Sequence, residues 1–139
     1  PGTFAENLNV NKGVTLKGAN AGVACGSRTA ESILAPASGV PVTIGADGVT
    51  LNGFELTAPS SFYGIIGSGY SNQHILFNNI HDVGTTASGA NVHSIINMIP
   101  NGTATENVTI ADNCFNNISS SLLTGYSASA LTPGTIFLI

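Results

Sequence analysis

One short pattern of apolar and polar positions recurs along the chain. Each copy runs apolar, variable, apolar, then a polar turn with Asn or Gly, then a second apolar anchor. The copies occupy residues 14–19, 49–54, 75–80 and 108–115, and the last has two extra residues before its second anchor. Alternation with a period of two predicts strands, and the Val and Ile at these positions suit a pleated surface. The Asn-Gly and Asn-Asn pairs tolerate positive φ and therefore predict turns.

The spacing of the copies predicts a solenoid. They begin at residues 14, 49, 75 and 108, which are 35, 26 and 33 residues apart, and solenoid repeats usually run about 20 to 45 residues. Further strands are predicted at 7–10, 32–34, 42–44, 64–66, 94–98 and 135–139. A β-sandwich would need close antiparallel pairs and does not predict one recurring skeleton. We therefore expect a single all-β domain over residues 1–139, a parallel β-helix of about 4–6 coils with little or no helix.

The alignment of the copies also predicts which side chains lie above one another. Stacked coils place equivalent residues about 4.8 Å apart. One internal apolar file should contain Val14, Val49, Ile75 and Val108, and a second should contain Leu16, Leu51, Phe77 and Ile110. At a corner, Asn52, Asn78 and Asn113 should form a hydrogen-bonded amide ladder. Such a ladder satisfies polar groups that are costly to bury unpaired.

The opening segment carries a family resemblance. Residues 1–22 read PGTFAENLNVNKGVTLKGANAG, which resembles a recurrent entry phrase of the pectin-lyase-like superfamily, in particular its bacterial secreted and cell-surface repeat proteins. The segments 49–56 and 106–118 resemble ordinary repeats of that family. The resemblance covers nearly the whole chain and implies a right-handed parallel β-helix. It does not specify a function, because this fold hosts polysaccharide lyases, glycoside hydrolases, adhesins and inert stalks.

The resemblance also bears on the ends of the chain. Family members usually carry another coil, often with a capping helix, before the phrase that opens at Pro1. Solenoids need caps because an open end exposes strand edges and core. We therefore expect this chain to be a segment of a longer solenoid. The alternative is end-to-end self-association, in which a head-to-tail contact that does not close builds a fibre.

Composition and charge narrow the classes of partner. Charged residues make up 7% of the chain, against roughly 25% in an average soluble protein, while 42% of residues are hydrophobic. Apolar runs reach only four or five residues, as at 136–139, so no membrane insertion is expected. The net charge is −4, and the basic residues are Lys12, Lys17 and Arg28. Nucleic acid needs clustered positive charge and is excluded. A surface rich in Asn, Thr and Ser favours a secreted or cell-surface location.

The two cysteines leave two states open. Cys25 and Cys114 permit only one disulfide. The predicted layout places them several coils apart, which favours a loop thiol and a second thiol packed near the core.

The candidates for catalysis are few. A lyase would need a basic residue, and all three basic residues lie in or just after the entry phrase, where a structural role is ordinary. No Asp cluster suits calcium, and no metal or cofactor is expected. Asp82 and Asp112 fall near corners of neighbouring coils and could form a hydrolase carboxylate pair. His81 and Asp82 are adjacent, and the alignment places Glu55, His81 and Asn116 in one outward polar file. A Glu beside a His could tune a general base, although a surface polar column has the same composition.

A binding loop is the last candidate. Phe62, Tyr63 and Tyr70 fall in a Ser/Gly-rich segment between two coils, where aromatic rings could contact a polysaccharide or cell-surface partner. The sequence thus favours a non-catalytic extracellular scaffold, adhesin stalk or fibre subunit. The alternative is a polysaccharide hydrolase or lyase, or a fragment of one.

Overall fold

Three parallel sheets run side by side along the molecule. The computed structural model describes residues 1–86, 94–99, 107–118, 121–124 and 137–138. Sheet A contains β1 (Gly2–Phe4), β4 (Ser32–Leu34), β7 (Glu55–Thr57), β10 (Asn79–His81) and β13 (Cys114–Asn116). Sheet B contains β2 (Leu8–Val10), β5 (Val42–Ile44), β8 (Tyr63–Ser68), β11 (Ser94–Ile99) and β14 (Ser121–Thr124). Sheet C contains β3 (Thr15–Lys17), β6 (Thr50–Asn52), β9 (His74–Leu76), β12 (Thr109–Ala111) and β15 (Phe137–Leu138).

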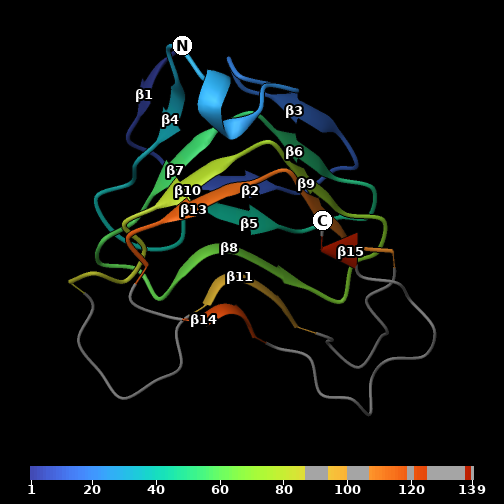
Figure 1. Cartoon of the computed structure of the whole chain (residues 1–139). Helices are drawn as coiled ribbons and strands as arrows, with labels where there is room; N and C mark the ends of the chain where they lie inside the picture. The colour runs from blue at the N-terminus through green and yellow to red at the C-terminus, as the bar shows by residue number, and fades with distance from the viewer. Residues whose placement is uncertain (87–93, 100–106, 119–120, 125–136, 139) are drawn as a thin grey trace.

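Successive strands along the chain visit sheets A, B and C in turn, so each set of three strands is one coil. The ladders in Figure 1 run β1 to β13 on the left, β2 to β14 through the middle and β3 to β15 on the right. Every strand pair is parallel. The described part of the chain is therefore a parallel β-helix of five coils, which confirms the predicted fold class. Its one helical segment among the described residues is the 3-10 turn η1 (Cys25–Ser27), and no described helix is long and apolar enough to span a membrane.

The register in sheet C corrects one of the predicted files. Leu16 pairs with Leu51, Leu51 with Ile75 and Ile75 with Ile110. Ile75 therefore belongs to the Leu16 file, not to the file of Val14, Val49 and Val108, and the third copy was aligned two residues too late. The position level with Val49 is taken by Gln73, which is fully buried. Gln73 is tolerated there because its Nε2 donates to Ala46 O and Ser71 O, both at 2.9 Å.

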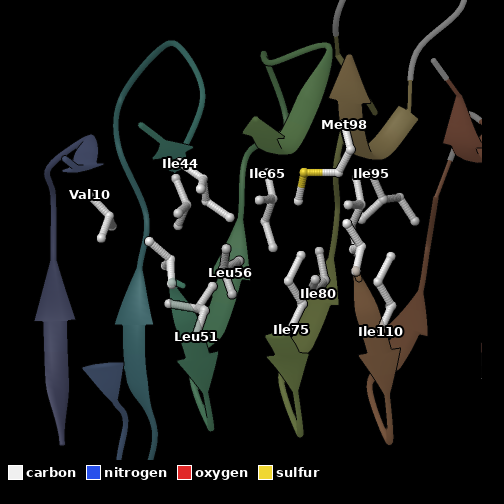
Figure 2. Close-up of a cluster of buried hydrophobic side chains, with 14 of the residues drawn as sticks. Val10, Ile44, Leu51, Leu56, Ile65, Ile75, Ile80, Ile95, Met98 and Ile110 are labelled. Atoms are coloured by element: carbon white, nitrogen blue, oxygen red, sulfur yellow. The ribbon is translucent and has the colours of Figure 1, made fainter. Parts of the chain in front are cut away.

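The core is a narrow column enclosed by the three sheets. Figure 2 shows the labelled side chains pointing from each strand into the space between the sheets. Its fully buried members include Leu51, Leu56, Ile65, Ile75, Ile80 and Ile95. Met98 reaches from β11 toward β8 (Figure 2), where Gly67 leaves room for it, since a Cβ on Gly67 would lie 2.8 Å from Met98 Sδ.

Single left-handed residues turn the corners between the sheets. The corner from sheet B to sheet C has positive φ at Gly48, Asn72 and Asn107. At the corner from sheet C to sheet A, the residues with positive φ are Gly53, Phe77 and Asp112. After sheet A, Asp82 and Asn117 also have positive φ. Gly, Asn and Asp accept this backbone readily, but Phe77, at φ 51°, is a bulky residue in a strained conformation. Phe77 was predicted inside the core and instead lies half-buried at this outer corner.

The amide ladder contains two of its three predicted members. Asn78 Nδ2 donates to Asn113 Oδ1 at 3.0 Å and to Leu51 O at 3.0 Å. Asn113 Nδ2 donates to Ile75 O at 2.7 Å. Asn52 lies outside the ladder because it is the last residue of β6, before the corner, and its Oδ1 accepts from Gly22 N at 3.0 Å.

A disulfide joins Cys25 to Cys114, with Cα atoms 5.7 Å apart. This corrects the interpretation that favoured two thiols. The two cysteines belong to coils that are far apart in the stack, but the segment after β3 leaves the first coil and brings Cys25 close to Cys114. Residues 18–31, which we call the strap, run along the corner between sheets C and A, reach the fifth coil at Cys25, where Cys114 begins β13, and return to the second coil at β4. Figure 1 shows η1 of the strap at the top of this corner.

Candidate functional site

The outward face of sheet A carries the ionisable cluster of interest. Strand alternation turns Leu56 and Ile80 into the core and leaves Glu55 and His81 on the outside. His81 pairs in register with Asn116, as predicted for the outward file. Glu55 instead pairs with Asn79, two residues earlier on β10. Glu55 and His81 are therefore diagonal neighbours on adjacent strands and are not paired in register. Their side chains are long enough to be in contact.

His81 lies between two carboxylates. Its Nδ1 is 2.6 Å from Asp82 Oδ2, and its Nε2 is 3.3 Å from Glu55 Oε1. A neutral imidazole has one N–H, so only the protonated ring can donate to both oxygens. The side chain of His81 is 20% exposed and that of Glu55 is 18% exposed, so protons from solvent reach the cluster.

Asp82 extends the cluster to the fifth coil. The backbone of Asp82 is in the left-handed conformation, as is that of Asn117 one coil further. Asn117 Nδ2 donates to Asp82 Oδ1. The pKa of Asp82 lies below its ordinary value, first because of the hydrogen bond with His81 and then because of the one from Asn117. Asp82 therefore stays ionised and serves as an acceptor that ties two coils together.

The strap adds a second ion pair next to the cluster. Arg28 Nε donates to Glu31 Oε1 at 2.7 Å and its NH2 donates to Glu31 Oε2 at 2.8 Å. The same guanidinium donates to Phe54 O and Phe77 O on successive coils. Burial raises the pKa of Glu31, but hydrogen bonds from Arg28 and Asn20 and the charges of Arg28 and His81 outweigh it, so the pKa lies below its ordinary value.

The sequence did not single out this pair. Arg28 was considered only as a lyase base, and Glu31 was not a candidate. An opposite-charge pair three residues apart in a chain with few charges was the available signal. Its role is structural in this geometry, because Arg28 donates four hydrogen bonds and its side chain is only 7% exposed.

Asp112 does not join the cluster. It lies at the corner before β13, whereas Asp82 lies after β10 and is level with Asn117. The two corners are five residues apart along sheet A, from 112 to 117, which corresponds to on the order of 10 Å or more of extended chain. The predicted carboxylate pair of Asp82 and Asp112 is therefore wrong. The pair that does form, Glu55 and Asp82, has an imidazole ring between its members, where a hydrolase needs a sugar and a water.

The aromatic candidates do not gather into a binding loop. Tyr63 begins β8, and Tyr70 follows two residues after its end at Ser68. A six-residue strand of the core-forming sheet B separates them, so they lie at opposite ends of that strand. Phe62 stays next to Tyr63 and is half-buried. The three residues do not form the single platform that was expected.

No three His, Cys, Asp or Glu side chains gather into a metal-binding group among the residues that the structure describes. The cluster links three coils through Glu55, His81–Asp82 and Asn117. No family model, curated protein or solved structure matches the chain.

Proposed function

We propose that this chain is a rigid structural segment of an extracellular or cell-surface β-solenoid, a scaffold or stalk and not an enzyme. The observation that carries the proposal is the bond between Cys25 and Cys114, which clamps the stack of coils along its axis. Its partners are 89 residues apart, and closing a loop of that size stabilises a fold by roughly 4–5 kcal/mol in the chain-entropy account.

The same bond supports the proposed location. Disulfides persist in oxidising compartments and are rare in the cytosol. The low charge and the entry phrase of residues 1–22 agree with a secreted protein related to the pectin-lyase-like superfamily. We further propose that the chain belongs to a longer stack. β1, β2 and β3 are each the last strand of a sheet, and Leu8, Val10, Val14 and Leu16 line an open hollow beside them.

Pulling single molecules from their two ends tests the mechanical role. In the oxidised chain the 89 residues between the cysteines cannot extend, so the unfolding length should be shorter by roughly 30 nm than in the reduced chain. The force needed to unfold the oxidised chain should also be higher. Equal lengths in the two states would show that the clamp does not carry load.

A second candidate function is polysaccharide hydrolysis. It is favoured by the contacts of His81 with Glu55 and Asp82, because these side chains are partly exposed to solvent. Incubation with uronate polymers and neutral glycans, followed by assays for reducing ends and unsaturated products, decides between the two. We expect no product. Product formation that is abolished in His81→Gln but retained in the surface control His74→Gln would overturn the scaffold proposal.

A further inference from the structure

The strap is far longer than its connection requires. In the second, third and fourth coils the corner from sheet C to sheet A is turned by two residues: Asn52 to Glu55, Leu76 to Asn79 and Ala111 to Cys114. In the first coil the same corner takes 14 residues, from Lys17 to Ser32. Twelve residues are therefore not needed to join the strands, and they lie instead along the outside of the later coils.

The strap is attached by polar contacts. Asn20 N donates to Gly53 O at 3.2 Å and Gly22 N to Asn52 Oδ1 at 3.0 Å. The packing is close at its base, where a Cβ on Gly53 would clash with Ala21 N. None of the buried hydrophobic residues of the described chain lies between 18 and 31. Beyond the base, attachment to the later coils depends on Arg28, through Phe54 O and Phe77 O, and on the disulfide.

The disulfide of the strap lies on the outside of the stack of coils. Cys25 is exposed, and Cys114 is half-buried on the outer face of β13. Exposed disulfides are more readily exchanged than buried ones. The core column lies on the other side of sheet A, so breaking this bond removes no apolar contact from it.

We propose that the strap is a redox-releasable clamp: reduction of the bond between Cys25 and Cys114 frees residues 22–30 from the corner while the three sheets remain folded. A thiolate of a dithiol reductant attacks Cys25 Sγ, the S–S bond breaks, and Cys114 Sγ leaves as a thiolate that takes up a proton. The second thiol of the reductant then displaces Cys25, which is protonated in turn. The protein gains two electrons and two protons, and the dithiol becomes a disulfide.

Release of the strap changes the corner between sheets C and A. Arg28 leaves the carbonyl oxygens of Phe54 and Phe77, which become accessible on two successive coils. Glu31 loses both hydrogen bonds from Arg28 and keeps the one from Asn20 Nδ2 at 2.7 Å. Its carboxylate then has no ion-pair partner in the strap.

Trypsin tests the clamp directly, because the chain offers it only Lys12, Lys17 and Arg28. Lys12 is exposed in both states and is the internal reference, while Arg28 is held almost fully buried. We expect cleavage after Arg28, relative to cleavage after Lys12, to rise roughly tenfold or more on reduction, since proteolysis follows the population of the open form. The double variant Cys25→Ser/Cys114→Ser should match the reduced chain with or without dithiol.

Two results would overturn the proposal. Equal cleavage after Arg28 in the oxidised and reduced chains would show that Arg28 alone holds the strap. Loss of the β-sheet circular dichroism signal on reduction would show that the bond is a global staple. The second result would leave the scaffold proposal standing, because that proposal concerns the oxidised chain. If the double variant does not fold, in situ reduction of the native chain still gives both measurements.

Discussion

Asn78 and Asn113 lie one above the other at the corner from sheet C to sheet A, joined by a hydrogen bond of 3.0 Å between their side-chain amides. Asn78 also accepts from Phe54 N at 3.0 Å, so one side chain satisfies groups on the coil before it and the coil after it. The ladder is therefore a link between coils that is independent of the strand pairing.

This arrangement predicts a large effect of Asn78→Ala. The change removes the side-chain partners of Phe54 N and Leu51 O, whereas Asn113 Oδ1 keeps its hydrogen bond from the backbone N of residue 78. Each polar group that loses its partner out of reach of water costs about 1–3 kcal/mol. We expect the free energy of unfolding in urea to fall by roughly 3 kcal/mol. Asn116→Ala is the matched control, since Asn116 is exposed and has one contact at 3.5 Å, and it should change stability by less than about 0.5 kcal/mol. Similar losses in both variants would contradict the ladder.

The ion pair of Arg28 and Glu31 predicts a pH dependence. The pKa of Glu31 is lowered in the folded chain from 4.5. The stability that its ionised form contributes is therefore present above that ordinary value and is lost as the pH falls through the folded pKa. Glu31→Gln should be less stable than the natural chain at neutral pH, and the difference should shrink below pH 4.5.

Urea unfolding at a series of pH values from about 7 to about 3 measures this difference. Asp82→Asn is the comparison, because the pKa of Asp82 is also lowered but its main partners are His81 and Asn117. A constant gap between Glu31→Gln and the natural chain across the series would exclude the assigned role of Glu31.

The strained backbone of Phe77 predicts that this residue can be replaced without loss of stability. Asn adopts positive φ readily, and relief of a left-handed conformation in a bulky residue is worth on the order of 1 kcal/mol. We expect Phe77→Asn to leave the melting temperature unchanged or to raise it. Phe54→Asn should lower it clearly, because Phe54 packs against the core and has no positive φ. Calorimetry measures the melting temperature of both variants. If Phe77→Asn lowered it as much as Phe54→Asn, packing of the Phe77 ring would outweigh the strain of its backbone.

The open edge at the first coil predicts self-association of the isolated chain. Val14 is 40% exposed and Phe4 is 44% exposed, the large exposed hydrophobic residues of the described chain. Val14 lies beside β3, whose other edge is unpaired. Val14→Lys adds a charge to this apolar end and should lower the mass measured by light scattering at high concentration, as charges on edges oppose pairing. Thr43→Lys, on the outer face of a central strand, is the control. A natural chain that stays monomeric at every concentration would contradict end-to-end stacking.

Much of the fold could be predicted from the sequence. The strands 32–34 and 42–44 have the predicted bounds. In the second, Val42 and Ile44 alternate with Thr43 between Pro41 and Gly45, which stop the strand. The register of the third coil was wrong for a physical reason. An apolar residue is expected at each anchor, whereas Gln73 occupies this one and its Nε2 donates to two carbonyl oxygens.

The candidate site was harder to predict. The contact of His81 with Asp82 follows from adjacency, and that of Glu55 with His81 follows from strand alternation on one face. The strap has no apolar period, so local pattern says nothing of its path. That path is fixed by Phe77 O and Cys114, which are 49 and 89 residues away from Arg28 and Cys25 respectively. Contacts of that range are not encoded in the local pattern of apolar and polar residues.

The position of Cys114 has a consequence for the order of events during folding. Cys114 begins β13, the first strand of the fifth coil. Cys25 therefore has no cysteine to bond until the fifth coil lies beside the strap, and it remains a thiol up to that point. Closure of the bond thus reports that the fifth coil has formed in its place, and a chain in which that coil is missing or shifted leaves a free Cys25 thiol that a thiol reagent detects.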